Sequence, residues 1–345
     1  MRAAVWTETR DLRVVEKPVG TPGPGEVRVV VGSAGICGSD LHWFRGDFDP
    51  VPGLTPGHEI GGTIDAVGAG VDHVREGDIV GVEPSLRCGD CEFCNLGQYQ
   101  HCRRHALLGI ALDGGLGQSV VTPGYTVFAA PSAVDAELAA MAEPLACSVH
   151  GYEKVGLRKD ETVLVQGAGS IGLTALLAAR AYGAKVLITA RHPHQREAAE
   201  RLGATEVIMD DETGERRLAE LAKDQAIDVV AEAVGGHADT IRVAVETVRP
   251  LGRVAVLGVF AIESAGLNPL TLLSKEVSVI GANTYSSPGG ESDYARGLEI
   301  IAEFPRESRS LVTHRYPLEE TAKGFATALD KGTASIKVHI LPNGS

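Results

Sequence analysis

Cysteine, histidine and acidic side chains are concentrated between positions 37 and 59 of this 345-residue chain. The stretch opens with Cys37-Gly38-Ser39-Asp40-Leu41-His42 and, after a loop with three prolines, closes with Gly57-His58-Glu59. Thiolate, imidazole and carboxylate are ligands that Zn²⁺ takes in proteins, and a catalytic zinc has three of them and one open position. Cys37, His58 and an acid would supply that set. A lone cysteine or histidine is usually a packing or turn residue, so the prediction depends on the combination.

Hydroxyl and imidazole groups in the same stretch are spaced to move a proton. Ser39 lies two residues after Cys37, and His42 lies three residues after Ser39. A hydroxyl beside a reacting alcohol can hand the proton of that alcohol to an imidazole nearer the solvent, which is general acid–base catalysis. We therefore predict that Ser39 and His42 form a proton relay beside the metal.

Four cysteines form a second candidate metal site, with the pattern C-x₂-C-x₂-C-x₇-C. They are Cys88, Cys91, Cys94 and Cys102. Four thiolates close a tetrahedral site completely, which is typical of a structural zinc. Disulfides, or a zinc module that binds nucleic acid, are the alternatives. The two-residue spacings favour chelation, and the acidic chain disfavours nucleic acid.

A glycine-rich loop follows the β-branched run at 162–165. It reads Gly167-Ala168-Gly169-Ser170-Ile171-Gly172 and precedes a helical pattern from Leu173 to Tyr182. In such a loop the first glycine permits a tight turn, the second lets backbone approach a pyrophosphate, and the third lets the helix pack on the strand. The helix N-terminus attracts the phosphates. We expect a dinucleotide site here, and a glycine-rich turn without a ligand is the alternative.

The elements that must position these residues fall into two patterns. Up to about residue 130 the chain predicts strands and loops rather than helices, with strands at 27–31, 61–67 and 78–82, which suggests a β-barrel-like domain. From about residue 145, apolar β runs alternate with helical stretches, which predicts a parallel sheet with helices on both faces. These runs lie at 162–165, 185–189, 228–230, 253–257 and 277–280. A helix at 318–329 and a strand at 336–341 are expected to return to the first domain.

Composition excludes several classes of partner. The net charge of −13 disfavours nucleic acid and anionic membranes, and the composition, with 44% hydrophobic and 22% charged residues, is that of a folded protein. No apolar run reaches membrane-spanning length, and the first residues lack the apolar segment of a signal peptide. We expect a cytoplasmic protein of two domains.

The motifs CGSDLH, GHE, the four-cysteine loop, EPLACSVHG and GAGSIG occur in the order found in a known family. The chain resembles the zinc-dependent medium-chain alcohol and polyol dehydrogenases, above all the sorbitol and threonine dehydrogenase branch. The resemblance spans essentially the whole chain. It implies a GroES-like β-barrel catalytic domain formed by residues 1–146 and 286–345. It also implies a doubly wound, parallel-sheet Rossmann domain at 147–285 and a homodimer or homotetramer.

The same resemblance assigns roles to single residues. Cys37 and His58 match the ligands of the catalytic zinc, Glu59 matches the acid that binds or exchanges at the metal, and Glu143 stands where this branch places an acid. The resemblance leaves open which of the two acids is the third ligand. Asp40 matches the residue that orients the histidine ligand, and Ser39 and His42 match the proton relay. One catalytic and one structural zinc are implied.

The implied reaction is hydride transfer between an alcohol and NAD(P). A secondary alcohol of the polyol, sugar or cyclitol type is our expected substrate, because the stretch from Gly115 to Ser119 carries a small polar residue where the family often has an aromatic one. We also expect Trp43, Phe44, Leu108 and Ser119 to line the pocket. The alternatives are a zinc-free NADPH-dependent reductase of activated double bonds and a catalytically silent nucleotide-binding protein.

The end of the second Rossmann strand bears on the choice of cofactor. Members that prefer NAD carry an acid there, whose carboxylate binds the ribose hydroxyls and repels a 2′-phosphate. This chain has Ala190 at that position, followed by Arg191, with Arg196 in the first turn of the next helix. We therefore predict that NADP(H) is favoured over NAD(H). The alternative is that both arginines are solvated charges near an NAD site.

Overall fold

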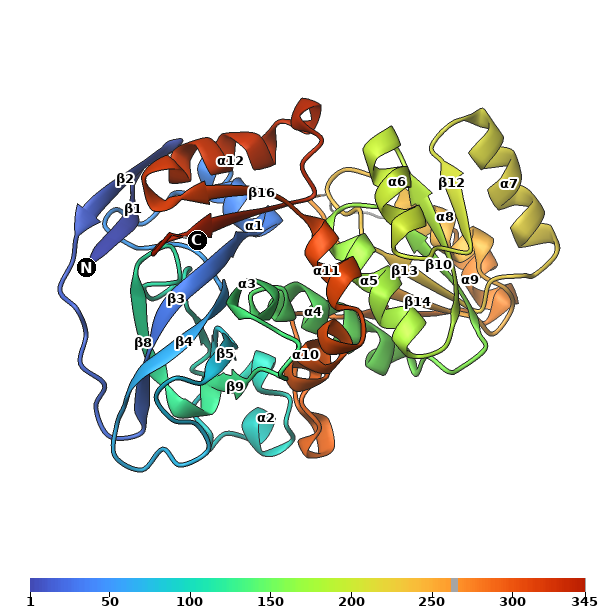
Figure 1. Ribbon diagram of the computed structural model, residues 1–345. Coiled ribbons are helices and arrows are strands. Elements are labelled where there is room, and N and C mark those ends of the chain that lie inside the picture. Colours follow the sequence, from blue (N-terminus) through green and yellow to red (C-terminus); the bar gives the residue numbers. More distant parts are fainter. Residues whose placement is uncertain (262–265, 345) are drawn as a thin grey trace. The chain divides into compact units, whose positions relative to one another are not determined.

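The chain folds into two compact units, which a computed structural model describes for residues 1–261 and 266–344. The first unit comprises Met1–Glu143 and Ser286–Ser345, and the second comprises Pro144–Tyr285. Figure 1 shows the first unit as mainly strands and the second as strands alternating with helices. A strand-rich first part of the chain and a parallel sheet with helices after it were expected from the sequence.

A seven-stranded sheet carries the first unit, in the order β16-β17-β3-β4-β5-β9, with β8 also paired to β3. Along β3, Val27, Val29 and Val31 are buried while the residues between them are partly exposed, so one face of the strand packs into the core. Two small sheets, β1-β2 and β6-β7, complete the strands of the unit. The bounds are β1 Arg2–Glu8, β2 Asp11–Glu16, β3 Glu26–Ile36, β4 Glu59–Val67, β5 Ile79–Val82, β6 Ser85–Leu86, β7 Ala106–Leu107, β8 Ser119–Pro123, β9 Val127–Ala129, β16 Val312–Pro317 and β17 Lys337–Leu341.

Short helices interrupt this part of the chain, and the expectation of strands and loops alone was wrong. Helix α1 runs over Gly38–Arg45, directly after Cys37. Asp40 fixes its start by accepting the backbone N–H of Cys37 at 3.0 Å, and Gly46 ends it with a left-handed φ of 87°. A helix of eight residues has too few turns for a repeat of apolar residues to be visible in the sequence. The other helices of the unit are α2 Glu92–Asn95, α3 Ala136–Ala139, α10 Asp293–Glu303, α11 Pro305–Leu311 and α12 Thr321–Leu329.

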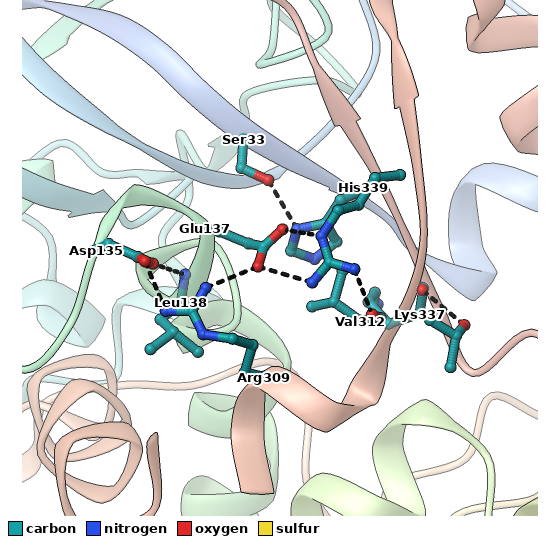
Figure 2. A network of polar contacts seen from close by, with 10 residues as sticks. Ser33, Asp135, Glu137, Leu138, Arg309, Val312, Lys337 and His339 are labelled. Atoms are coloured by element: carbon teal, nitrogen blue, oxygen red, sulfur yellow. Dashed lines mark hydrogen bonds and ion pairs between the residues drawn. The ribbon is translucent and has the colours of Figure 1, made fainter. Parts of the chain in front are cut away.

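The C-terminal segment joins the first unit, as expected from its sequence. Strand β17 pairs antiparallel with β3, with Val338 opposite Ile36, and α12 follows one turn of 3₁₀-helix at Leu318–Glu320. Ion pairs attach the segment to α3 (Figure 2): Arg309 binds Asp135 at 2.6 Å and Glu137 at 3.0 Å. In the same network Ser33 Oγ lies 2.7 Å from His339 Nδ1.

The second unit is built on a parallel six-stranded sheet in the order β12-β11-β10-β13-β14-β15. This is the 3-2-1-4-5-6 order of dinucleotide-binding folds. All five predicted runs are strands, and β12 is a sixth that the sequence did not reveal. The strands are β10 Thr162–Gln166, β11 Lys185–Ala190, β12 Glu206–Met209, β13 Val229–Glu232, β14 Arg253–Val256 and β15 Ser278–Gly281. The helices are α4 Ala142–Val155, which begins at the end of the first unit, α5 Ser170–Ala181, α6 Pro193–Arg201, α7 Glu212–Lys223, α8 Thr240–Thr247 and α9 Pro269–Lys275.

No helix within the described ranges combines the length and the apolar character needed to cross a membrane.

Candidate active site and cofactor loop

Three residues from two neighbouring elements bring their donor atoms together in the first unit. Cys37 precedes α1, His58 precedes β4, and Glu59 is the first residue of β4. The Cys37 sulfur, a His58 ring nitrogen and a Glu59 carboxylate oxygen all lie within 4.8 Å of one another. His58 is 5% exposed and Glu59 is fully buried, whereas Cys37 is partly exposed. Sulfur, nitrogen and oxygen donors at this spacing fit a single zinc ion.

The imidazole of His58 lies between two polar side chains of α1. Its Nδ1 is 3.5 Å from Asp40 Oδ1, and its Nε2 is 3.4 Å from Ser39 Oγ. Burial lowers the pKa of His58, but the Asp40 carboxylate and the Cys37 thiolate outweigh that effect and raise it well above its usual value. The surroundings of His58 therefore favour positive charge, which a bound cation would supply in place of a proton.

Both carboxylate oxygens of Glu59 accept from one buried lysine. Lys337 Nζ lies 2.6 Å from Oε1 and 2.8 Å from Oε2, and it also donates to the carbonyl of Ile36 at 3.3 Å. Burial lowers the pKa of Lys337, but Glu59 and Cys37 outweigh it and raise that pKa. Gly35, opposite Glu59 in the sheet, makes room for this carboxylate, because a Cβ there would lie 1.9 Å from Glu59 Oε2.

Glu143, the second predicted acid, lies in the first turn of α4 and is 6% exposed. It contributes to the raised pKa of Lys337, so its charge acts on the same buried ammonium as that of Glu59. Its carboxylate is not among the donor atoms that lie within 4.8 Å of one another in the described chain. Glu59 is therefore the acid that the geometry brings to Cys37 and His58.

The predicted relay residues occupy successive turns of one helix. Ser39 and His42 are three residues apart in α1 and lie on the same face of it. His42 is 29% exposed, whereas Ser39 lies beside the buried His58. Ser39 and His42 are both partly exposed, so solvent reaches this face of α1.

The four cysteines of the loop 88–102 also converge. Their sulfur atoms lie within 4.8 Å of one another, with separations of 3.4 Å from Cys102 to Cys88, 3.6 Å from Cys91 to Cys94 and 3.8 Å from Cys88 to Cys94. All four are thiols rather than disulfides. The edge of a tetrahedron with a metal–sulfur bond of about 2.3 Å is about 3.8 Å, so this set fits a closed tetrahedral zinc site. Backbone N–H groups of Arg103 and Cys94 lower the pKa of Cys91 to about 6.

The glycine-rich loop lies at the end of β10 and opens α5. Gly167 has a φ of 90°, and Gly172 approaches the backbone so closely that a Cβ would lie 1.7 Å from the carbonyl oxygen of Gly167. A Cβ at Gly169 would meet open space, so packing does not require a glycine there. Ser170 Oγ is buried without a hydrogen-bond partner in the described part of the chain. An open approach and an unpaired hydroxyl at a helix N-terminus fit a pyrophosphate.

The strand end that bears on the cofactor carries more charge than the sequence suggested. Ala190 ends β11 and is buried, and the exposed Arg191 follows it, with its Nε 3.9 Å from Oδ2 of Asp210, the residue after β12. Arg196 lies in α6 and binds Glu200 at 2.8 Å. A carboxylate is therefore present near this site, directly after the neighbouring strand.

The predicted pocket residues lie in different surroundings. Trp43 lines a small hollow, together with Leu54 and Ile110. Phe44 and Leu108 are buried in the core of the unit. Ser119 is 9% exposed in β8, and its Oγ donates to Met1 Sδ at 3.0 Å. The argument for a polar pocket from Ser119 therefore fails.

Residues 23–132 match the model of the alcohol dehydrogenase GroES-like domain, and residues 170–303 match the zinc-binding dehydrogenase model. The chain is 32% identical to the sorbitol dehydrogenase of Bacillus subtilis over 99% of its own length and 98% of that protein. The chain belongs to the zinc-binding medium-chain dehydrogenases. The resemblance seen in the sequence is thereby confirmed, and this medium-chain dehydrogenase is an alcohol oxidoreductase that uses a nicotinamide cofactor.

Two solved structures of other dehydrogenases extend this result to the fold. A zinc-binding dehydrogenase from Sinorhizobium meliloti bound to NADP has a TM-score of 0.89 and 29% identity, with 99% of each chain covered. An alcohol dehydrogenase from Escherichia coli CFT073 in complex with NADH has the same values. Since one relative is bound to NADP and the other to NADH, the likeness does not select either cofactor for this dehydrogenase.

Three residues near the candidate sites of the two units were not found from the sequence. Lys337 lies 278 positions after Glu59, and only the pairing of β17 with β3 brings them together. Asp210 was missed because β12 was missed. Asp47, which contacts His42 at 2.7 Å, lies beyond a helix end that the sequence did not reveal. For Lys337, the one signal in the sequence is a lysine within the apolar strand pattern near the C-terminus.

Proposed function

We propose that this dehydrogenase is a zinc-dependent enzyme that transfers hydride between a secondary alcohol of the polyol, sugar or cyclitol type and NADP(H). We further propose one catalytic zinc at the Cys37 and His58 cluster and one structural zinc at the four cysteines. The observation that carries the proposal is the cluster of Cys37, His58 and Glu59 next to the hydroxyl of Ser39. The substrate class rests on the similarity to a sorbitol dehydrogenase.

The residues before α1 and at the start of β4 would hold the metal, and residues of α1 would move the proton. Cys37 and His58 would bind zinc, with Asp40 facing the other ring nitrogen of His58, and Glu59 or Glu143 would complete the set. Bound zinc is a Lewis acid that polarises the substrate oxygen and makes its proton easier to lose. Ser39 would take that proton in alcohol oxidation and pass it to His42, which releases it to solvent. In carbonyl reduction the same residues would deliver the proton.

The loop from Gly167 to Gly172 would bind the pyrophosphate of the cofactor, with Ser170 and Ile171 at the start of α5. Arg191 and Arg196 would contact the 2′-phosphate beside Ala190. Both are exposed and bound to acids in ion pairs, which are weak at the surface and can yield to a phosphate. Asp210 would oppose this preference, because its charge repels the phosphate.

The test compares both cofactors with a panel of secondary alcohols and their ketones by absorbance of the reduced nicotinamide. Charge-assisted contacts should favour NADP(H) by at least roughly tenfold in kcat/KM. Arg191→Ala should reduce that ratio and Asp210→Asn should increase it, while Glu76→Gln, an exposed acid elsewhere, serves as the control. Equal or better use of NAD(H) by the wild type would contradict the proposed preference.

A metal assay on the pure protein separates this proposal from its alternatives. Two zinc ions per chain are expected. A zinc-free reductase or a silent nucleotide-binding protein would not need the Cys37 and His58 site, so one zinc or none would favour those functions. We also propose a cytoplasmic homodimer or homotetramer, which light scattering on the purified protein would test.

A further inference from the structure

A carboxylate and a guanidinium compete for one ring nitrogen of His42. Asp47 Oδ2 lies 2.7 Å from Nδ1 of His42, and Arg45 Nη2 lies 2.9 Å from the same nitrogen. Arg45 also donates to Asp47 Oδ2, from Nη2 at 2.7 Å and from Nε at 3.2 Å. The three charged or titratable side chains thus form one cluster at the end of α1.

The backbone places Asp47 over the imidazole. Gly46 N–H bonds to the carbonyl of Trp43 at 3.1 Å, and Asp47 N–H bonds to that of His42 at 2.9 Å, which is a Schellman turn. The turn needs the left-handed Gly46, whose φ is 87°. The turn therefore bonds the backbone of Asp47 to His42, which is also the residue that the Asp47 side chain contacts. The other neighbour recorded for the ring is Phe48, with centroids 5.9 Å apart, which carries no charge.

The two partners require opposite tautomers of His42. Asp47 is an acceptor, so its bond requires a proton on Nδ1 and leaves the lone pair on Nε2. Arg45 is only a donor, so its bond requires a lone pair on Nδ1 and moves the proton to Nε2. The contact of Asp47 with Nδ1 of His42 is shorter than that of Arg45, and Arg45 can keep both of its bonds to Asp47 without the one to His42. The tautomer that Asp47 requires should therefore be the one that forms.

We propose that Asp47 is a positioning residue that holds a proton on Nδ1 of His42 and so reserves Nε2 as the basic atom of the relay, while Arg45 opposes it. A proton arriving on Nε2 then gives an imidazolium whose Nδ1–H still donates to Asp47, and Nε2 returns that proton to water. The hydrogen bonds from Arg45 and His42 also lower the pKa of Asp47, so the carboxylate stays charged through the working pH range. The inference rests on the proposed relay.

Two charge-removing variants should shift the pH profile of alcohol oxidation in opposite directions. Asp47→Asn removes a negative charge, so His42 gives up its proton more readily and the acid limb of kcat moves to lower pH, by about half a unit for an exposed pair. Its plateau rate should fall about three- to tenfold because the tautomer is no longer selected. Arg45→Met should move the limb to higher pH. Asp49→Asn, an exposed acid of the same loop, should change neither.

A second measurement does not depend on activity. Nitrogen-15 NMR of histidine-labelled protein, assigned with His42→Gln, should show Nδ1 of His42 protonated in the wild type and a mixture of tautomers in Asp47→Asn. A proton on Nε2 in the wild type, or shifts of the acid limb in the same direction for both variants, would overturn the proposal. If His42→Gln leaves the pH profile unchanged, the relay is wrong, and the NMR result alone then decides whether Asp47 sets the tautomer.

Discussion

The surroundings of His58 favour a positive charge on or beside its ring, which either a proton or a metal ion can supply. Asp40 and Cys37 surround its ring with negative charge, and both raise its pKa against the effect of burial. Zinc competes with protons for such donors, so metal affinity should depend on pH. The cluster therefore has the electrostatics of a cation site in addition to the spacing.

Cys37→Ser or His58→Ala should abolish turnover while the protein still binds nucleotide. Loss of a Lewis acid removes several kcal/mol of transition-state stabilisation, whereas the glycine loop belongs to the other compact unit. Steady-state rates and titration of nucleotide fluorescence measure the two effects. A variant that keeps more than about a tenth of the wild-type rate would contradict the assignment of the catalytic zinc.

Removing one charge from the buried ion pair of Glu59 and Lys337 should destabilise the first unit. Lys337→Met should lower the free energy of unfolding by about 3–5 kcal/mol, because it leaves the carboxylate of Glu59 buried and unpaired. A zinc ion near Glu59 would replace part of the lost charge, so the loss should be smaller with zinc than with a chelator. Thermal unfolding under both conditions measures it. Lys323→Met, at an exposed ion pair with Glu320, is the control, and an equally small effect at both lysines would contradict the argument.

At the scale of elements, α1 does more than the motif within it revealed. The order of Cys37, Ser39, Asp40 and His42 indicated their chemistry, but the helix itself depends on Asp40 as a cap and on Gly46 as a terminator. Eight residues give too few turns for hydrophobic periodicity to be visible. The sequence therefore identified the side chains but not the helix, α1, that holds them in place.

The parallel sheet was predictable because each strand is a local apolar run. Strand β12 was not, since three of its four residues are only partly buried at the edge of the sheet. Contacts between distant segments were also beyond the sequence. Lys337 meets Glu59, and Arg309 meets Glu137, only because β17 and α11 return to β3 and α3.

Loss of a cysteine from the four-cysteine loop should lower the stability of the fold more than the rate of the reaction. Cys91→Ser removes one thiolate from a closed tetrahedral set, whose metal binding contributes to folding free energy. We expect one zinc per chain instead of two, a lower melting temperature, and near wild-type turnover below that temperature. Cys147→Ser, a cysteine outside both clusters, should keep both metals. If Cys91→Ser melts with the wild type but has lost its activity, this zinc has more than a structural role.

At the scale of the whole molecule, stability should depend on a buried carboxyl group in the first unit. Glu83 follows β5 and is fully buried, with Arg87 at 3.4 Å, and Arg87 lies over the rings of Tyr99 and Tyr125 at 4.0 and 4.6 Å. Burial raises the pKa of Glu83 to about 7, although Arg87 acts in the opposite direction. Tyr99 belongs to the four-cysteine loop, so this carboxyl lies where the loop joins the sheet.

The sign of the pH dependence follows from that raised pKa. Between the ordinary glutamate value of about 4.5 and the folded value of about 7, the folded chain binds more protons than the unfolded one, so stability falls as pH rises through this range. The full shift corresponds to about 3 kcal/mol. Glu83→Gln mimics the protonated form, so between pH 5 and pH 8 the wild type should lose about 2.5 kcal/mol more than this variant.

Urea unfolding at both pH values, with zinc held constant, measures that difference, and comparison at each pH cancels the titration of the metal ligands. Glu76→Gln, an exposed acid of the same unit, should track the wild type at both pH values. If Glu83→Gln and the wild type lose the same stability, Glu83 is ionised throughout, and Arg87 outweighs burial at this position.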